Sequence, residues 1–81
     1  PMPWVDQAIS IFAATNGFLD DQPINKLGKF ESEFLTFLQT NKADLRKSIE
    51  EKEMIDETVE TELKSALNEF AEAFSAENSS T

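Results

Sequence analysis

The chain has 81 residues, no cysteine, no histidine and a formal net charge of −9. This length allows one small domain or a piece of a larger protein. Because the sequence starts at Pro1 rather than at a methionine, we expect the natural start to lie further upstream. The missing residue types exclude disulfides, zinc sites with the usual ligands, thiol nucleophiles and imidazole bases. The lack of cysteine also fits a reducing, cytosolic compartment.

The negative charge is unevenly distributed along the chain. Residues 1–49 carry six acidic and five basic residues, and residues 50–81 carry ten and two, so the net charges are −1 and −8. A surface of that sign repels phosphate backbones and anionic lipids, so we expect no binding to nucleic acid or to a membrane surface. No apolar run reaches the roughly 18–20 residues of a membrane span, so we also expect no insertion. A basic partner would be attracted, although a solvated acidic face is the interpretation we favour.

Apolar residues recur at helical spacing and rarely alternate, which predicts an all-α fold, a small bundle of about four helices without strands. The first helix is expected over about residues 4–16, with Pro3 in its first turn and Gly17 at its left-handed stop. Its apolar face is expected to contain Trp4, Val5, Ala8, Ile9, Ile11, Phe12 and Thr15. Asp6, Gln7 and Ser10 are expected on the opposite, solvated face.

The stretch NGFLDDQP at residues 16–23 has three interpretations: a metal loop, an acidic catalytic site or a connector. In a calcium loop opening at Asp20, the third, fifth and sixth positions would take two oxygen ligands and a glycine, but Gln22, Ile24 and Asn25 stand there. We therefore interpret the stretch as a structural connector formed by Gly17, Phe18, Leu19, Asp20, Asp21 and Pro23. We expect Gly17 to end one helix and Pro23 to start the next. Phe18 and Leu19 are expected to pack the loop against the bundle, and the two carboxylates are expected to face solvent.

The second helix is expected over about residues 24–40, after Pro23. Its weak point is Gly28, which costs about 1 kcal/mol relative to alanine. The inward residues are expected to be Leu27, Phe30, Phe34, Leu35, Phe37 and Leu38. A short third helix is expected over about residues 42–51. Asn41 is expected to cap it, and Asp44 is expected to be the acidic residue of its first turn. Leu45 and Ile49 are expected to form its apolar stripe.

The last helix has the clearest amphipathic pattern in the chain and is expected over about residues 57–74, capped by Asp56. Its inward residues are expected to be Val59, Leu63, Ala66, Leu67, Phe70 and Phe74. Its solvated side is expected to hold Glu60, Lys64, Asn68 and Glu72. Residues 1–74 thus form the expected helical domain, and residues 75–81 a flexible C-terminal tail.

Catalysis by this chain alone is not expected. The remaining acid–base candidates are carboxylates on solvated helix faces, where nothing would raise a pKa towards neutrality. The two glycines, Gly17 and Gly28, are too far apart for a phosphate-binding loop. We therefore predict no catalytic, cofactor-binding or metal residue. Trp4 is either a core residue, which we favour, or an anchor for a partner.

The residues that identify a family lie mainly in the first half of the chain. These are the strings Pro1-Met-Pro3, Asp6-Gln7, Ile11 to Asp21 (IFAATNGFLDD), Pro23 and Phe30-Glu31-x-x-Phe34-Leu35. In this order they resemble the C-terminal domain of the alpha subunit of F-type ATP synthase, and the likeness extends over nearly the whole chain. Trp4 stands where that family usually has valine, and Phe12 and Phe18 stand where tyrosine is common.

The resemblance implies a part of a left-handed superhelical bundle at the membrane-facing end of a ring of alternating alpha and beta subunits. Its implied partners are the beta subunits and the gamma and epsilon subunits of the central stalk. ATP or ADP and magnesium would bind elsewhere in the full-length subunit, which binds nucleotide without turning it over. The implied location is the cytoplasmic side of an energy-coupling membrane, the bacterial inner membrane, as a peripheral part of the complex. The alternative is an independent acidic helical adaptor that binds a basic protein.

The resemblance also implies further helices ahead of Pro1. The surface that they would cover should then be bare in this chain, and we expect it to include the first helix with Trp4. We therefore expect the isolated chain to form a weak homodimer on that helix.

Overall fold

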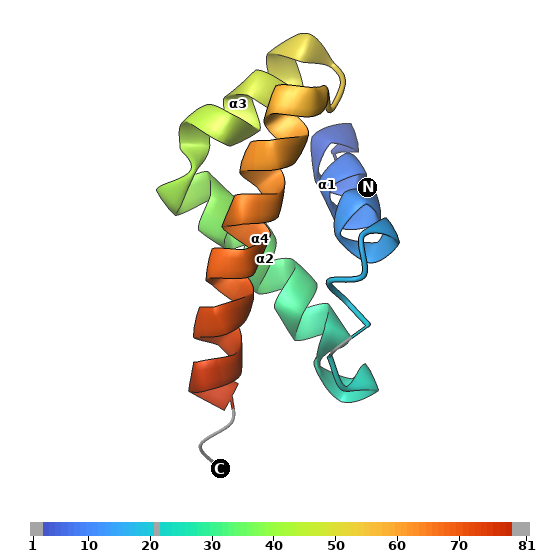
Figure 1. Ribbon diagram of the computed structural model, residues 1–81, viewed down its shortest axis with the longest axis vertical. Coiled ribbons are helices and arrows are strands. Elements are labelled where there is room, and N and C mark those ends of the chain that lie inside the picture. The colour runs from blue at the N-terminus through green and yellow to red at the C-terminus, as the bar shows by residue number, and fades with distance from the viewer. Residues whose placement is uncertain (1–2, 21, 79–81) are drawn as a thin grey trace.

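The computed structural model describes residues 3–20 and 22–78. In these ranges the chain forms four α-helices and one 3-10 turn and no strand, so the predicted all-α class is confirmed. The molecule is elongated, with extents of 40 × 24 × 21 Å. Figure 1 shows the longest helix running along the long axis, with the second helix crossing it and the first helix lying to one side.

Helix α1 spans Trp4–Thr15 and packs on α2 and α3. Its buried apolar residues are Val5, Ile9, Phe12 and Ala13. The buried apolar face of α1 is therefore narrower than the sequence predicts, since Trp4 is 45% exposed and Ile11 is 62% exposed. Asp6, which was expected in solvent, is buried. Both corrections have one cause: α1 turns a single face to the bundle, and that face includes a carboxylate whose partner comes from α3.

Helix α2 spans Leu27–Asn41 and follows the 3-10 turn η1 at Ile24–Lys26, which starts after Pro23 as expected. Phe30, Phe34 and Leu38 are buried along it. Phenylalanine rings of α2 pack against Phe70 and Phe74 of the last helix. Phe30 lies edge-on to both, with ring centroids 5.1 Å apart in each pair.

Helix α3 spans Ala43–Lys52 and turns sharply away from α2 at Lys42, which has φ −132° and ψ 43°. The expected cap at Asn41 is wrong, because α2 continues through that residue and Lys42 takes the N-cap position without a side-chain hydrogen bond. Leu45 and Ile49 are buried as predicted. The helix ends at Glu53, whose φ of 56° places it in the left-handed region.

Helix α4 spans Glu57–Asn78 and supplies the largest share of the core. All six of its predicted inward residues are buried: Val59, Leu63, Ala66, Leu67, Phe70 and Phe74. The helix extends past the expected boundary at Phe74, because Ser75, Ala76 and Glu77 continue it without a glycine or proline to stop it. The expected tail overlaps the described chain only at residues 75–78, and residues 79–81 lie outside the described part.

Candidate functional site

The connector after α1 is an ordered helix stop. Gly17 has φ 81°, the left-handed value expected for it. The Phe18 N–H donates to the Ala13 carbonyl at 3.0 Å, and the Gly17 N–H donates to the Ala14 carbonyl at 3.2 Å. These two hydrogen bonds form a Schellman motif, which satisfies carbonyls that the helix end would leave unpaired. A side chain at Gly17 would be strained by this backbone conformation.

The apolar residues of the connector lie against the core, whereas its carboxylate faces solvent. Phe18 and Leu19 are partly buried and pack on the hydrophobic cluster. Asp20 is exposed, and its N–H donates to the Gly17 carbonyl at 3.2 Å. Asp21 lies outside the described residues. This geometry supports the connector interpretation, because the loop fixes the position of α1 relative to α2.

An ion pair with little exposure to solvent joins α1 to α3. Arg46 Nη2 lies 2.8 Å from Asp6 Oδ1, and Arg46 Nη1 lies 2.9 Å from Glu50 Oε1. The side chains of Asp6 and Arg46 are only 12% and 16% exposed, whereas Glu50 is 50% exposed. An ion pair with so little access to water is screened weakly by salt and holds its geometry firmly.

Sequence reasoning missed this pair because Asp6 and Arg46 are 40 residues apart. One signal was available: Arg46 is the single arginine in a chain with six lysines. Arginine is the usual choice for a buried or two-pronged ion pair, since its planar guanidinium presents several fixed donors.

Two buried polar atoms beside the pair have no protein hydrogen-bond partner. They are Ser10 Oγ and Arg46 Nε. Ser10 follows Asp6 by one helical turn, so both side chains lie on the same side of α1. Buried polar groups are nearly always satisfied, and an ordered water is the usual partner where the protein offers none.

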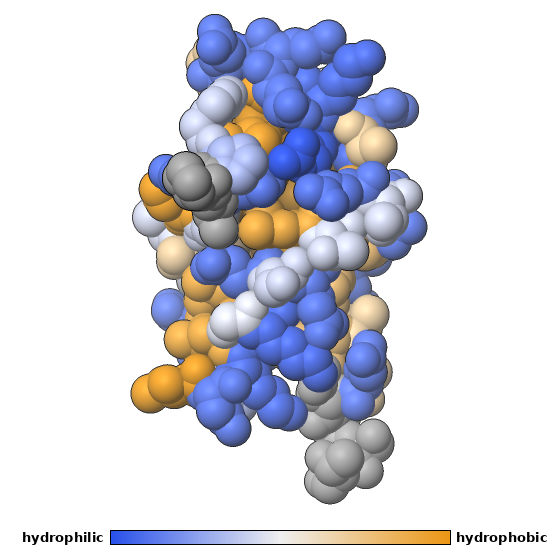
Figure 2. Space-filling view, turned by 180° about the vertical axis from the view of Figure 1, so that it is seen from behind, coloured by the Kyte–Doolittle hydropathy of each residue, from blue (hydrophilic) through white to orange (hydrophobic). Residues whose placement is uncertain are grey.

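The second residue singled out from the sequence, Trp4, lies on the outside of α1 rather than in the core. Its exposed fraction of 45% contradicts the core interpretation that we favoured. Seen from behind in Figure 2, apolar surface reaches the outside along the edge of the molecule where α1 lies. Trp4 is therefore partly exposed in the described chain.

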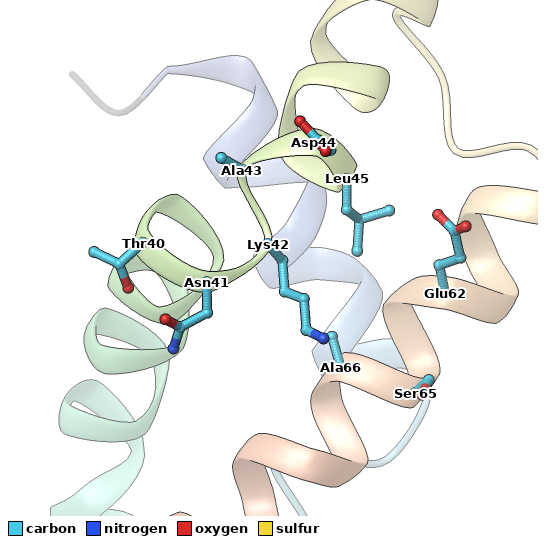
Figure 3. A pocket seen from close by; sticks show the side chains of 9 residues that line it. All are labelled: Thr40, Asn41, Lys42, Ala43, Asp44, Leu45, Glu62, Ser65 and Ala66. Carbon is cyan, nitrogen blue, oxygen red and sulfur yellow. The ribbon is translucent and has the colours of Figure 1, made fainter.

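A pocket of about 540 Å³ lies between α4 and the corner where α2 turns into α3. Figure 3 shows Lys42 and Leu45 on one side of it, and Glu62 and Ser65 on the other. The Lys42 ammonium lies 3.4 Å from Glu69 Oε1, so this cation already has a partner. The described residues contain no group of three or more His, Cys, Asp or Glu placed to hold a metal ion.

Asp56 caps α4 as the sequence predicts. Its Oδ1 accepts a hydrogen bond from the Val59 N–H at 2.9 Å, and its Oδ2 lies 2.9 Å from the Lys52 ammonium. The Val59 N–H, followed by Lys52, holds the pKa of Asp56 below its ordinary value of 3.8. Both contacts favour the ionised carboxylate.

Most of the side-chain contacts described above join one helix to another or close a helix end, and the pair of Arg46 with Glu50 lies within α3. They define a class: a small all-α domain whose charged residues organise the packing of its own helices. Residues 1–70 match the family described as "ATP synthase alpha/beta chain, C terminal domain", and the chain belongs to that family. The family inferred from the sequence is thereby confirmed.

Two relatives are similar over nearly the whole chain. The chain is 42% identical over 74 residues to a protein named ATP synthase subunit alpha from Syntrophomonas wolfei, which covers 91% of this chain. It is also 42% identical over 76 residues to the protein of the same name from Desulfovibrio desulfuricans, which covers 94% of this chain. In both cases the match spans only 15% of the relative's length.

Within the described part, none of the helices combines the length and apolar character that crossing a membrane requires.

Proposed function

We propose that this chain is the C-terminal helical part of a non-catalytic alpha subunit of F-type ATP synthase. In this role it serves as a structural and interaction module. The observation that carries the proposal is the match to proteins named ATP synthase subunit alpha at 42% identity over nine-tenths of the chain. The structure supports a module of this kind, because its own core of 15 apolar residues joins all four helices.

The resemblance supplies the setting of the module. It lies at the membrane-facing end of a ring of alpha and beta subunits, around a central stalk that contains gamma and epsilon. It is a peripheral part of the complex on the cytoplasmic side of an energy-coupling membrane, the bacterial inner membrane. Nucleotide and magnesium bind to other parts of the full-length subunit, and this chain contributes no residue to them.

The physical contribution of this chain is to present helix faces in fixed relative positions. The Schellman stop at Gly17 and the ion pair of Asp6 with Arg46 determine where α1 lies on the bundle. The outer side of α1, with Trp4 and Ile11, is then the apolar surface that other parts of the subunit can cover. The acidic side of α4 stays solvated.

A second candidate is an independent acidic adaptor that binds a basic protein. The observation in its favour is the net charge of −8 over residues 50–81, carried largely by exposed carboxylates of α4 such as Glu62 and Glu72.

A chimera distinguishes the alpha-subunit module from the adaptor. The C-terminal 15% of the Syntrophomonas alpha subunit is replaced by this chain, and assembly with the other subunits is followed by native mass spectrometry.

We expect the chimera to enter a complete ring. The control is the same chimera carrying Ile49→Asp, which places a charge at a fully buried position and should abolish assembly. A chimera that is folded and soluble but never joins beta subunits would contradict the proposal and favour the adaptor.

Nucleotide binding by the isolated chain is a second test. Calorimetry with ATP and magnesium should detect no saturable binding, because the chain has no glycine-rich phosphate cradle. Binding tighter than about 10 μM would contradict the proposal, since it corresponds to roughly 7 kcal/mol of contacts.

A further inference from the structure

Helices α2, α3 and α4 are joined to one another in all three possible pairs. Each of them packs on both of the others, whereas α1 packs on α2 and α3 through its single buried face. Between α2 and α4, the ring of Phe30 lies 5.1 Å from those of both Phe70 and Phe74. At the corner between α2 and α3, the Lys42 ammonium lies 3.4 Å from Glu69 Oε1 on α4. None of these contacts requires α1, so we expect α2–α4 to keep their packing when α1 leaves.

Helix α1 depends on the bundle more than the bundle depends on α1. Of the 15 core residues, α1 supplies Val5, Ile9, Phe12 and Ala13. Its C-terminal end is closed from within, because the N–H groups of Gly17 and Phe18 donate to carbonyls of its own last turn. A helix of 12 residues is marginal in water by itself, and Pro3 gives α1 no side-chain cap. Undocking should therefore also unfold α1 and release its amide protons.

The ion pair between α1 and α3 can separate without leaving a buried charge unpaired. Arg46 Nη2 lies 2.8 Å from Asp6 Oδ1, and Arg46 Nη1 lies 2.9 Å from Glu50 Oε1 on the same helix as Arg46. When α1 leaves, the guanidinium keeps Glu50 as its partner and gains water, and Asp6 is hydrated on the released segment. Breaking a buried pair is most costly when one charge stays buried and unpaired, which does not happen here. The pair holds α1 in place and still permits its release.

We propose that α1 is a latch, a segment that undocks and unfolds as a unit while α2, α3 and α4 stay folded, and then docks again. Domains open in such cooperative pieces, and pieces with few buried apolar contacts open most readily. The open state brings to solvent the Arg46 side chain, which is 16% exposed when α1 is docked. In the alpha subunit of the proposed function, the latch lets the chain ahead of α1 shift relative to α2–α4 without unfolding their core. This last consequence rests on the proposed function, whereas the latch itself does not.

Native-state hydrogen exchange tests the latch on the 81-residue chain, followed by NMR at urea concentrations below the unfolding transition. We expect the slowest amides of α1 to exchange at least about tenfold faster than the slowest amides of α4. Their rates should also rise less steeply with urea, because undocking one helix exposes less surface than unfolding the whole chain. If the slowest amides of both helices share one rate and one urea dependence, α1 unfolds only with the rest of the domain and the proposal is overturned.

A variant in α4 separates undocking from global unfolding. Phe74 is 2% exposed, and the C-terminal end of α4 runs away from α1 in Figure 1. Phe74→Leu should speed up exchange of the slowest α4 amides at least about tenfold. It should leave the α1 amides unchanged, because it destabilises the docked and the undocked state equally. Equal acceleration of the α1 amides would contradict the latch.

A variant in α1 separates undocking from fraying of the helix ends. Asp6→Ala should speed up exchange of the slowest α1 amides at least about tenfold, because the pair with Arg46 exists only in the docked state. The matched control is Asp20→Ala, at an exposed aspartate that follows α1, and it should change their exchange less than about twofold. Unchanged α1 exchange in Asp6→Ala would show fraying rather than undocking and would overturn the proposal. Because exchange is measured on the chain alone, this failure is distinct from a failure of the chimera to assemble.

Discussion

The ion pair between Asp6 and Arg46 offers the sharpest test of how α1 is held. Replacing Asp6 with alanine leaves Arg46, whose side chain is only 16% exposed in the parent chain, with only the half-exposed Glu50 to pair with it. Breaking a fully buried pair costs about 3–5 kcal/mol. Since both groups retain some solvent access and one partner remains, we expect a loss of about 2–3 kcal/mol. For a domain of this size that corresponds to a fall in Tm of roughly 10–20 °C.

Replacing both partners should be far less harmful than removing one. In Asp6→Leu with Arg46→Met, neither charge is left unpaired and apolar volume fills the site, so we expect a stability within about 1 kcal/mol of the parent. The control is Glu33→Ala, which breaks the exposed pair with Lys29 and should cost no more than about 0.5 kcal/mol. Urea unfolding followed by circular dichroism measures all three. If Asp6→Ala costs as little as Glu33→Ala, the pair does not fix α1.

Further predictions concern the helix ends. Gly17→Val should destabilise the fold by at least about 1–2 kcal/mol, because the residue has a φ of 81°. Gly28→Ala should stabilise the fold by about 0.5–1 kcal/mol, because the added methyl meets no atom within 4 Å. Thermal melts measure both changes. Glu53→Gly should stabilise by up to about 1 kcal/mol, since its φ of 56° suits glycine; a lower Tm would show that another contact of Glu53 matters. The pKa of Asp56 is lower in the folded than in the unfolded chain, so its contribution is complete above about pH 4 and is lost as pH falls through the folded pKa. Asp56→Asn should therefore flatten the loss of stability in that acid range, as urea unfolding at pH 2–5 would reveal.

The sequence predicts most of the fold because the core residues repeat at helical spacing. The stripe of α4 from Val59 to Phe74 and the pair Leu45 and Ile49 of α3 are buried as the periodicity indicates. Gly17 also allowed a specific prediction, since its neighbours Asn16 and Phe18 mark a helix end and few residues other than glycine tolerate that backbone conformation.

What the sequence could not predict are the choices that depend on neighbours distant in the chain. A wide apolar arc on α1 does not reveal which part is buried, and only contact with α3 selects Asp6 over Trp4 for the inside. The boundary at Asn41 was misplaced for a related reason. Asparagine suits an N-cap, but α2 extends through it until Lys42 breaks the helical backbone.

If this chain acts as a structural module of an ATP synthase alpha subunit, a complex that contains it should couple ATP hydrolysis to proton transport, and both rates can be measured in membrane vesicles. Inverted membrane vesicles containing the Syntrophomonas alpha chimera are compared with vesicles containing the unmodified subunit, with hydrolysis and proton uptake measured in the same sample. We predict nearly equal hydrolysis per complex and nearly equal proton uptake per ATP hydrolysed. A chimera that assembles but loses hydrolysis would contradict a purely structural role for this chain.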